Sequence, residues 1–168
     1  MDHLTVPGIY MHADERCLIV NLSYAVLDFS PCNIVHIGIG WGGSLYCSRI
    51  GAPLATLYGV DIVGADDLKG DELMREELNL QVLRGDSRVV TFSEPIHFLY
   101  VDGDHTYEVV KSDIARWAPK VVPGGYIAFH DCIGDWAAGI NRAIAEELDP
   151  SEWEDCGIES WSRYFRRL

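Results

Sequence analysis

Acidic and histidine side chains follow two apolar segments of this sequence, in places where they can do acid–base or metal chemistry. The segments 98–101 and 126–129 are rich in β-branched and aromatic residues, which is typical of buried strands. In open α/β sheets, ligands bind at the carboxyl ends of the strands. We therefore expect one ligand-binding edge to carry five polar side chains: Asp102, Asp104, His105, His130 and Asp131.

Two kinds of chemistry suit these side chains. His105 titrates near neutral pH and is a candidate general base, with a surface histidine in a first helical turn as an equal alternative. Asp102 and Asp131 end neighbouring strands and, with His130, can hold a divalent ion that lowers the pKa of a substrate hydroxyl. The carboxylates suit Mg²⁺, whereas His130 favours Mn²⁺ or Zn²⁺. Asp104 is better explained as the N-cap of the next helix.

Strands and helices alternate along most of the chain, which predicts a parallel, doubly wound α/β sheet. An N-terminal helix is expected to begin near Asp14 and to end at Pro31. A single helical turn is expected within 87–92, and a Pro-Gly-Gly turn over 123–125. The expected strands are 33–38, 54–60, 80–83, 96–101, 126–129 and two more near 153 and over 162–165; the expected helices are 43–49, 66–78, 106–117 and 136–148.

A glycine-rich segment, GIGWGGS over 38–44, follows the first expected strand. Glycines permit positive φ and a close approach to a ligand, and the next helix offers unpaired N–H groups. The spacing fits the dinucleotide pattern G-x-G-x-x-G and equally G-x-G-x-G, with Gly38, Gly40 and Gly42. Asp61 lies just beyond the second strand, where a carboxylate can bind both ribose hydroxyls. Loop and acid together predict an adenosine-type cofactor, although Asp61 as a loop cap is an alternative.

Asp86 and Ser87 follow the third expected strand. An Asp followed by a Ser at this place can bind the amino group and ring nitrogens of an adenine. A role in capping the short segment after them is a nearly equal alternative.

Composition limits the classes of function. The chain has 168 residues and 48% hydrophobic residues, enough for one globular domain. Its five cysteines include no CxxC pair, which favours reduced thiols in the cytoplasm. A net charge of −13 argues against a nucleic-acid partner. We find no long apolar run and no signal-peptide pattern, so we expect no membrane partner.

The segments IVHIGIGWGGS, YGVDIVG, VLRGDS and the run 98–132 resemble the class I S-adenosylmethionine-dependent methyltransferases in order and spacing. Among these, the likeness is to a small family with a D-G-D-H-x-Y signature and a PGG turn before an H-D strand end. The resemblance covers roughly 14–150. It implies a single Rossmann-like domain over 1–168, with an N-terminal segment and helix (1–30), a core (33–150) and C-terminal strands (151–168). It also implies seven strands, mostly parallel, with an antiparallel last strand.

The resemblance implies S-adenosylmethionine as the cofactor. Its methionine part would lie along the glycine loop, its ribose at Asp61, and its adenine between Asp86 and Ser87. At His36 the chain departs from the family, which usually has an acid there; a histidine can serve as a hydrogen-bonding strut but supplies no permanent charge. The expected cofactor-binding residues are His36, Gly38, Gly40, Gly42, Ser44, Asp61, Asp86, Ser87 and Asp102.

The leading hypothesis is therefore a methyltransferase that acts on an oxygen of a small molecule, of sugar or phenol type, with Mg²⁺ or Mn²⁺ assistance left open. Methyl transfer is an in-line displacement, so the protein must align the acceptor and remove its proton. The catalytic candidates are Asp102, His105 and Asp131. An NAD(P)-dependent oxidoreductase and a non-catalytic nucleoside-binding relative remain alternatives. A homodimer is also considered, because a second subunit can help to build the substrate pocket.

Overall fold

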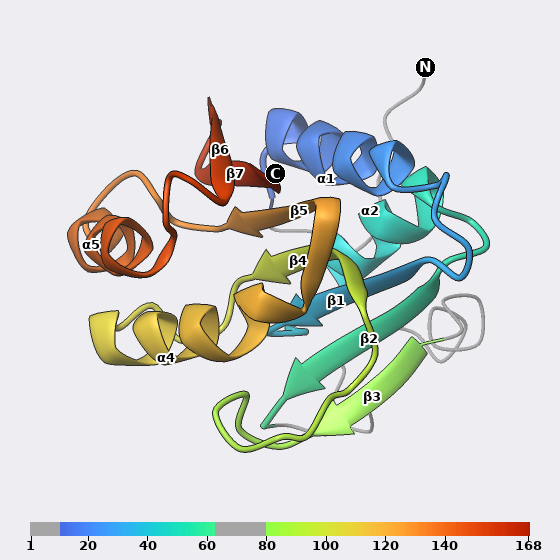
Figure 1. Cartoon of the computed structure of the whole chain (residues 1–168), viewed down its shortest axis with the longest axis horizontal. Helices are drawn as coiled ribbons and strands as arrows, with labels where there is room; N and C mark the ends of the chain where they lie inside the picture. Colours follow the sequence, from blue (N-terminus) through green and yellow to red (C-terminus); the bar gives the residue numbers. More distant parts are fainter. Residues whose placement is uncertain (1–10, 63–79) are drawn as a thin grey trace.

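A seven-stranded sheet forms the centre of the protein in this computed structural model, which describes residues 11–62 and 80–168 (Figure 1). The strand order is β3-β2-β1-β4-β5-β7-β6. The first five strands run parallel, and β7 is antiparallel to both β5 and β6. This confirms the predicted Rossmann-like sheet. The strands are β1 (Asn33–Ile37), β2 (Thr56–Asp61), β3 (Leu80–Arg84), β4 (Ile96–Val101), β5 (Val121–Phe129), β6 (Trp153–Glu159) and β7 (Ser162–Arg167).

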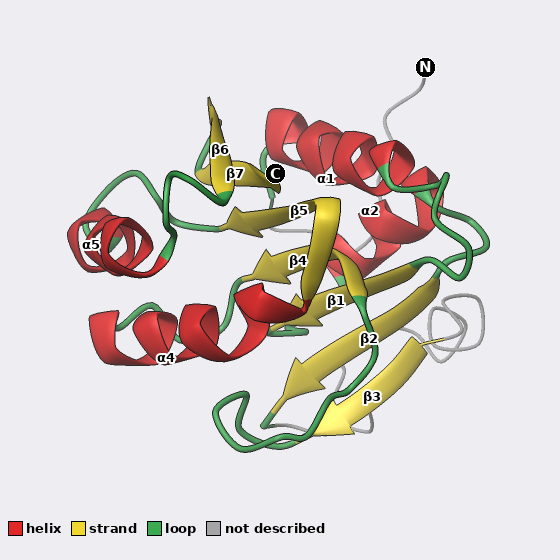
Figure 2. Cartoon of the chain, in the orientation of Figure 1, coloured by secondary structure: helices red, strands yellow, loops and turns green. Residues whose placement is uncertain are grey.

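Helices cover both faces of the sheet (Figure 2). Helices α1 (Ala13–Ala25) and α2 (Gly43–Gly51) pack on one face, and α4 (Tyr107–Trp117) and α5 (Ala137–Glu147) on the other. Successive side chains of a strand point to opposite faces of the sheet. Strand β4 therefore contributes Phe98 to the apolar core under α1 and α2, and Leu99 to the apolar core under α4 and α5. Every residue of β4 is buried, as expected for the central strand of a sheet covered on both sides.

Several element boundaries differ from the sequence-based expectations. Helix α1 ends at Ala25 rather than at Pro31, because hydrogen-bonded turns replace the helix after Tyr24. Strand β5 begins at Val121, so the Pro-Gly-Gly segment forms an irregularity inside the strand, with Gly124 at a φ of 82°. Strand β2 begins two residues later than predicted. The expected turn within 87–92 is present as a bond from the Val90 N–H to the Asp86 carbonyl (2.9 Å).

The predicted helix over 66–78 lies outside the described residues. Among the residues that are described, no helix has the length and apolar character needed to cross a membrane.

Candidate active site

A cavity of about 490 Å³ opens where the parallel strands β1 to β4 end. Such an edge is the usual ligand-binding place in open α/β sheets. The cavity brings together six of the predicted cofactor residues, although they are far apart in the sequence. These are Gly38, Gly40, Asp61, Asp86, Ser87 and Asp102.

The glycine loop passes so close to the end of β4 that Gly38 admits no side chain. A Cβ at Gly38 would lie 2.1 Å from the carbonyl oxygen of Asp102, and the residue has a φ of 87°. The carboxylate of Asp61 accepts a hydrogen bond from the backbone N–H of Ile39 (2.8 Å). Asp61 thus fixes the loop in addition to lining the cavity. Gly42 has a φ of 79° at the N-cap of α2.

Helix α4 supports the far end of the cavity. The hydroxyl of Ser87 donates a hydrogen bond to Asp113 (2.6 Å), and the indole N–H of Trp117 donates to the Ser87 carbonyl (3.0 Å). Burial raises the pKa of Asp113 to about 6, although the bond from Ser87 opposes this. Asp86 instead pairs with Arg88, and the hydrogen bonds from Arg88 lower the pKa of the Asp86 carboxyl to about 2.

The structure does not place His36, Gly42 or Ser44 among the residues that line the cavity. His36 is completely buried, and its Nδ1 and Nε2 lie 3.0 Å and 2.9 Å from the hydroxyls of Ser44 and Ser48. Burial lowers the pKa of His36 to about 3, so the ring is neutral at physiological pH. His36 therefore joins β1 to α2 as a hydrogen-bonding strut, and any effect on a cofactor is indirect.

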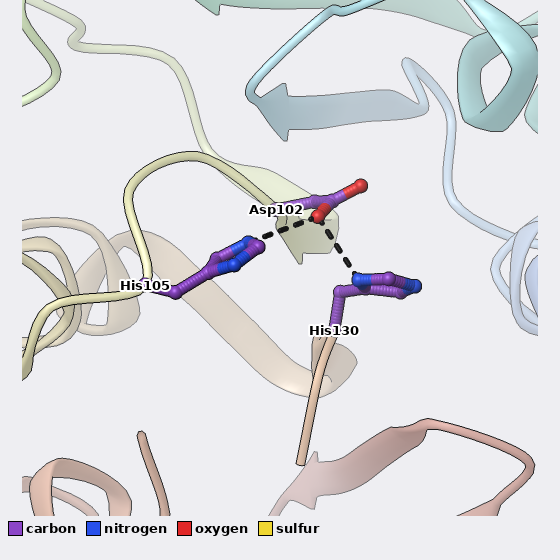
Figure 3. Close-up of side chains that lie close together, drawn as sticks. All are labelled: Asp102, His105 and His130. Carbon is purple, nitrogen blue, oxygen red and sulfur yellow. Dashed lines mark ion pairs between the residues drawn. The ribbon is translucent and has the colours of Figure 1, made fainter. Parts of the chain in front are cut away.

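Next to the cavity, five residues form a carboxylate–imidazole cluster. Asp102 lies between His105 and His130, with its Oδ1 3.5 Å from His105 Nε2 and 3.2 Å from His130 Nδ1 (Figure 3). The second nitrogen of each ring faces another carboxylate. His105 Nδ1 lies 3.1 Å from Asp131, and His130 Nε2 lies 2.9 Å from Glu15. The cluster thus consists of Glu15, Asp102, His105, His130 and Asp131.

The carboxylates set the charge of the two imidazoles. Burial alone would lower the pKa of His130, but the carboxylates of Asp102 and Glu15 raise it to about 10. The nearby carboxylate of Asp102 likewise raises the pKa of His105. Burial of Asp102 acts in the opposite direction, yet the two imidazoles lower its pKa. The carboxylates therefore favour a positively charged His130 between them.

Two members of the site region have roles that sequence reasoning missed or left open. Glu15 comes from α1, is 1% exposed and accepts a hydrogen bond from Ser162 (2.8 Å). Its signal in the sequence is an acid on the same helical stripe as Leu18 and Leu22. Asp104 accepts a hydrogen bond from the Thr106 N–H (2.7 Å) in a turn before the helix. The N-cap of α4 is Thr106, so the prediction that Asp104 is the N-cap is wrong.

Three residues of the cluster offer ligand atoms for a divalent ion. Asp102, His105 and His130 each offer one ligand atom, and these three atoms lie within 4.8 Å of one another. Two of them, His105 Nε2 and His130 Nδ1, are buried and have no hydrogen bond of good geometry within the described part of the chain. The predicted ligand set paired Asp102 and His130 with Asp131, whose Oδ1 lies 3.3 Å from His130. The residues present therefore fit a metal ion.

Comparison with known proteins gives the family. A family model described as "Methyltransferase domain" matches residues 35–132, from β1 to just beyond β5. The chain belongs to this methyltransferase family. The matched segment contains the glycine loop, the cavity residues and all of the cluster except Glu15.

Solved methyltransferase structures share the fold. CalS11, a TDP-rhamnose 3'-O-methyltransferase of calicheamicin biosynthesis, is 19% identical with a TM-score of 0.70 over 90% of this chain and 77% of CalS11. The O-methyltransferase NovP is 18% identical, with a TM-score of 0.68 over 90% of this chain and 79% of NovP. MycE, in complex with Mg, SAH and mycinamycin VI, is 18% identical with a TM-score of 0.70. That match covers 95% of this chain and half of MycE.

Proposed function

We propose that this protein transfers a methyl group from S-adenosylmethionine to a hydroxyl oxygen of a small molecule of sugar or phenol type. The position of Asp102 carries this proposal. Asp102 lines the cavity proposed for the cofactor, and its carboxylate is also the centre of the carboxylate–imidazole cluster. A methyl donor in the cavity and an acceptor at the cluster would therefore meet at one residue.

The cavity offers a suitable group for each part of the cofactor. Backbone at Gly38 and Gly40 would lie along the methionine part, the Asp61 carboxylate would accept the ribose hydroxyls, and Asp86 and Ser87 would flank the adenine. When bound, the cofactor supplies the methyl group and its own leaving group. The protein then needs to orient the two reactants and to remove the proton of the acceptor hydroxyl.

The cluster supplies what the acceptor needs. Carboxylate oxygens of Asp102 and Asp131 would hold the acceptor hydroxyl, and the imidazole of His105 between them would take its proton. If a divalent ion is held by Asp102 and the imidazoles instead, His105 is a ligand and not the base; the ion would lower the pKa of the hydroxyl, and the carboxylate of Asp131 would accept the proton. Asp131 has a φ of 53°, an uncommon value for a residue with a side chain, and such backbone is found preferentially at functional sites.

Apolar side chains beside the cluster suit a ring-shaped acceptor. The indole of Trp136 lies edge-on to His105, with 6.3 Å between ring centroids, and 59% of its surface is exposed. Ile133, on the same segment after Asp131, is also exposed. Flat apolar surface next to a few directed polar groups is typical of small-molecule sites. The CalS11 and MycE structures support the same class of acceptor and a nucleoside cofactor, since they are described as a TDP-rhamnose methyltransferase and as a complex with SAH.

Thermal shift with S-adenosylhomocysteine (SAH) and with NAD tests the proposal. SAH at about 100 times its dissociation constant adds about 2.7 kcal/mol, which raises the melting temperature of a chain of this size by roughly 5–10 °C. Asp61→Asn should weaken this shift, whereas Asp28→Asn, an exposed acid outside the cavity lining, should not. No shift with millimolar SAH would contradict the proposal. A shift with NAD alone would favour the oxidoreductase alternative.

A further inference from the structure

We propose that Asp102, His105 and His130 bind a divalent transition-metal ion, such as Mn²⁺, Fe²⁺, Co²⁺ or Zn²⁺, in preference to Mg²⁺, and that Glu15 is the positioning residue behind His130. The inference rests on the proposed function, because the ion would act on the acceptor hydroxyl. It goes beyond that function by naming the class of metal and the outer residues that select it.

One nitrogen of each imidazole faces the same carboxylate oxygen. Nε2 of His105 and Nδ1 of His130 lie 3.5 Å and 3.2 Å from the same oxygen of Asp102. Both nitrogens are buried and lack a well-formed hydrogen bond to any described residue. A buried polar atom without a partner is costly, and a ligand is one of the few things that explains it. Two nitrogens and one oxygen within 4.8 Å can occupy one face of a metal ion.

The opposite side of each ring is held by a carboxylate. Glu15 lies 2.9 Å from Nε2 of His130, and Asp131 lies 3.1 Å from Nδ1 of His105. A carboxylate that accepts the outer N–H fixes the tautomer, so that the inner nitrogen presents a lone pair. This carboxylate–histidine–metal arrangement is common around bound metals, and it occurs here twice in one cluster.

Buried contacts hold the carboxylate of Glu15 in place behind His130. The residue is 1% exposed, and the hydroxyl of Ser162 donates to the same oxygen that faces His130. Helix α1, strand β7 and the end of β5 therefore all contribute to the orientation of one ring. A buried carboxylate is retained only where it is paired, and here its partner is the ring of His130.

The donor types decide between metals. Mg²⁺ prefers six oxygen ligands in octahedral geometry and retains several waters. Imidazole nitrogen suits later divalent ions better, and two histidines with one carboxylate are typical of Fe²⁺ sites. The chain thus presents a nitrogen-rich site.

Direct metal titration tests the inference without an acceptor substrate. Co²⁺ is added to the metal-free full chain and followed by its visible absorption, and Mg²⁺ or Mn²⁺ is then added as a competitor. We expect Mn²⁺ to displace Co²⁺ at far lower concentration than Mg²⁺ does. Glu15→Gln should weaken Co²⁺ binding by about 10–100-fold, whereas Asp14→Asn, an exposed acid on the same helix, should leave it unchanged.

A double variant that exchanges one ligand atom tests whether the type of donor selects the metal ion. His130→Asp combined with Glu15→Gln replaces a nitrogen ligand by an oxygen and leaves no carboxylate at position 15 without its imidazole partner. Relative to the wild type, this double variant should bind Mg²⁺ more tightly and Co²⁺ more weakly. Circular dichroism and a cooperative thermal melt of every variant confirm that the protein is folded.

Three results would overturn the inference: equal competition by Mg²⁺ and Mn²⁺, unchanged Co²⁺ binding in Glu15→Gln, or no Co²⁺ binding at all. The last would mean that a protonated His130 occupies the centre as a fixed cation. If SAH binds and no ion does, the methyltransferase proposal survives and the metal site is wrong. If an ion binds and SAH does not, the metal site stands and the proposed function fails.

Discussion

Asp113 provides a test of how helix α4 supports the cofactor cavity. Its side chain is 1% exposed, it accepts the Ser87 hydroxyl through Oδ1, and its buried Oδ2 has no hydrogen bond to the described residues. Burial raises the pKa of the carboxyl from 3.8 to about 6. Because the folded chain favours the protonated form, Asp113 contributes most to stability at low pH and loses that contribution as pH rises.

The two pKa values give the size of the effect. Below about pH 4 the carboxyl is protonated in both states. As pH rises from about 3 to 7, the unfolded chain releases the proton before the folded chain does, so the free energy of unfolding falls by about 3 kcal/mol in total. About 1.3 kcal/mol of this loss falls between pH 5 and 7 by the same relation. That range lies above the isoelectric point of about 4.7.

Urea unfolding of the wild type and Asp113→Asn at pH 5, 6 and 7 measures this loss. The wild-type free energy of unfolding minus that of the variant should fall by about 1.3 kcal/mol from pH 5 to pH 7. Other titrating groups are common to both proteins, so their contributions cancel in the difference. A difference that stays constant with pH would mean that Asp113 is already ionised in the folded chain, and would refute the assignment.

The remaining predictions concern the elements around the cavity. Gly38→Ala should lower the free energy of unfolding by more than about 2 kcal/mol, because its Cβ would overlap the Asp102 carbonyl at a positive φ. Gly40→Ala should lower it by only about 1–2 kcal/mol, because a Cβ there would have no neighbour within 4 Å; equal losses in urea unfolding would contradict this. His36→Ala should cost about 2–4 kcal/mol in the same assay, because it leaves a cavity and removes a hydrogen-bond partner from the buried hydroxyls of Ser44 and Ser48. In the wild type, the unfolded ring of His36 gains a proton below about pH 6.5, whereas the folded ring, with a pKa of about 3, does not, so acidification lowers the free energy of unfolding. His36→Gln should reduce this loss. An unchanged dependence of the free energy of unfolding on pH would count against a buried neutral ring. Trp117→Phe removes the bond to the Ser87 carbonyl and should weaken SAH binding about 2–10-fold by calorimetry, with an unchanged affinity as the contrary result.

The fold and much of the site could be predicted from local sequence patterns. Alternating strands and helices determine the sheet, and polar residues directly after strands 96–101 and 126–129 meet because parallel strands end at one edge. Glu15 and Asp113 could not be placed in this way. Each sits on a helix, and its partner (Ser162 for Glu15, Ser87 for Asp113) lies far along the chain, so only the packed structure reveals the pair.

The same limit explains the errors of detail. Proline at 31 suggested a helix end, but the hydrogen-bonded turns after Tyr24 end the helix earlier. The Pro-Gly-Gly segment suggested a turn outside the sheet, yet β4 pairs with residues on both sides of it. Turn residues within a strand are recognised only when the partner strand is known.

A crystal structure of the protein with SAH tests the central claim most directly. We predict that the ligand fills the cavity at the ends of β1 to β4, with its ribose hydroxyls on the Asp61 carboxylate, its adenine beside Ser87 and its sulfur toward Asp102. SAH bound elsewhere on the protein, or an empty cavity at saturating SAH, would contradict the proposal that this chain is an S-adenosylmethionine-dependent methyltransferase.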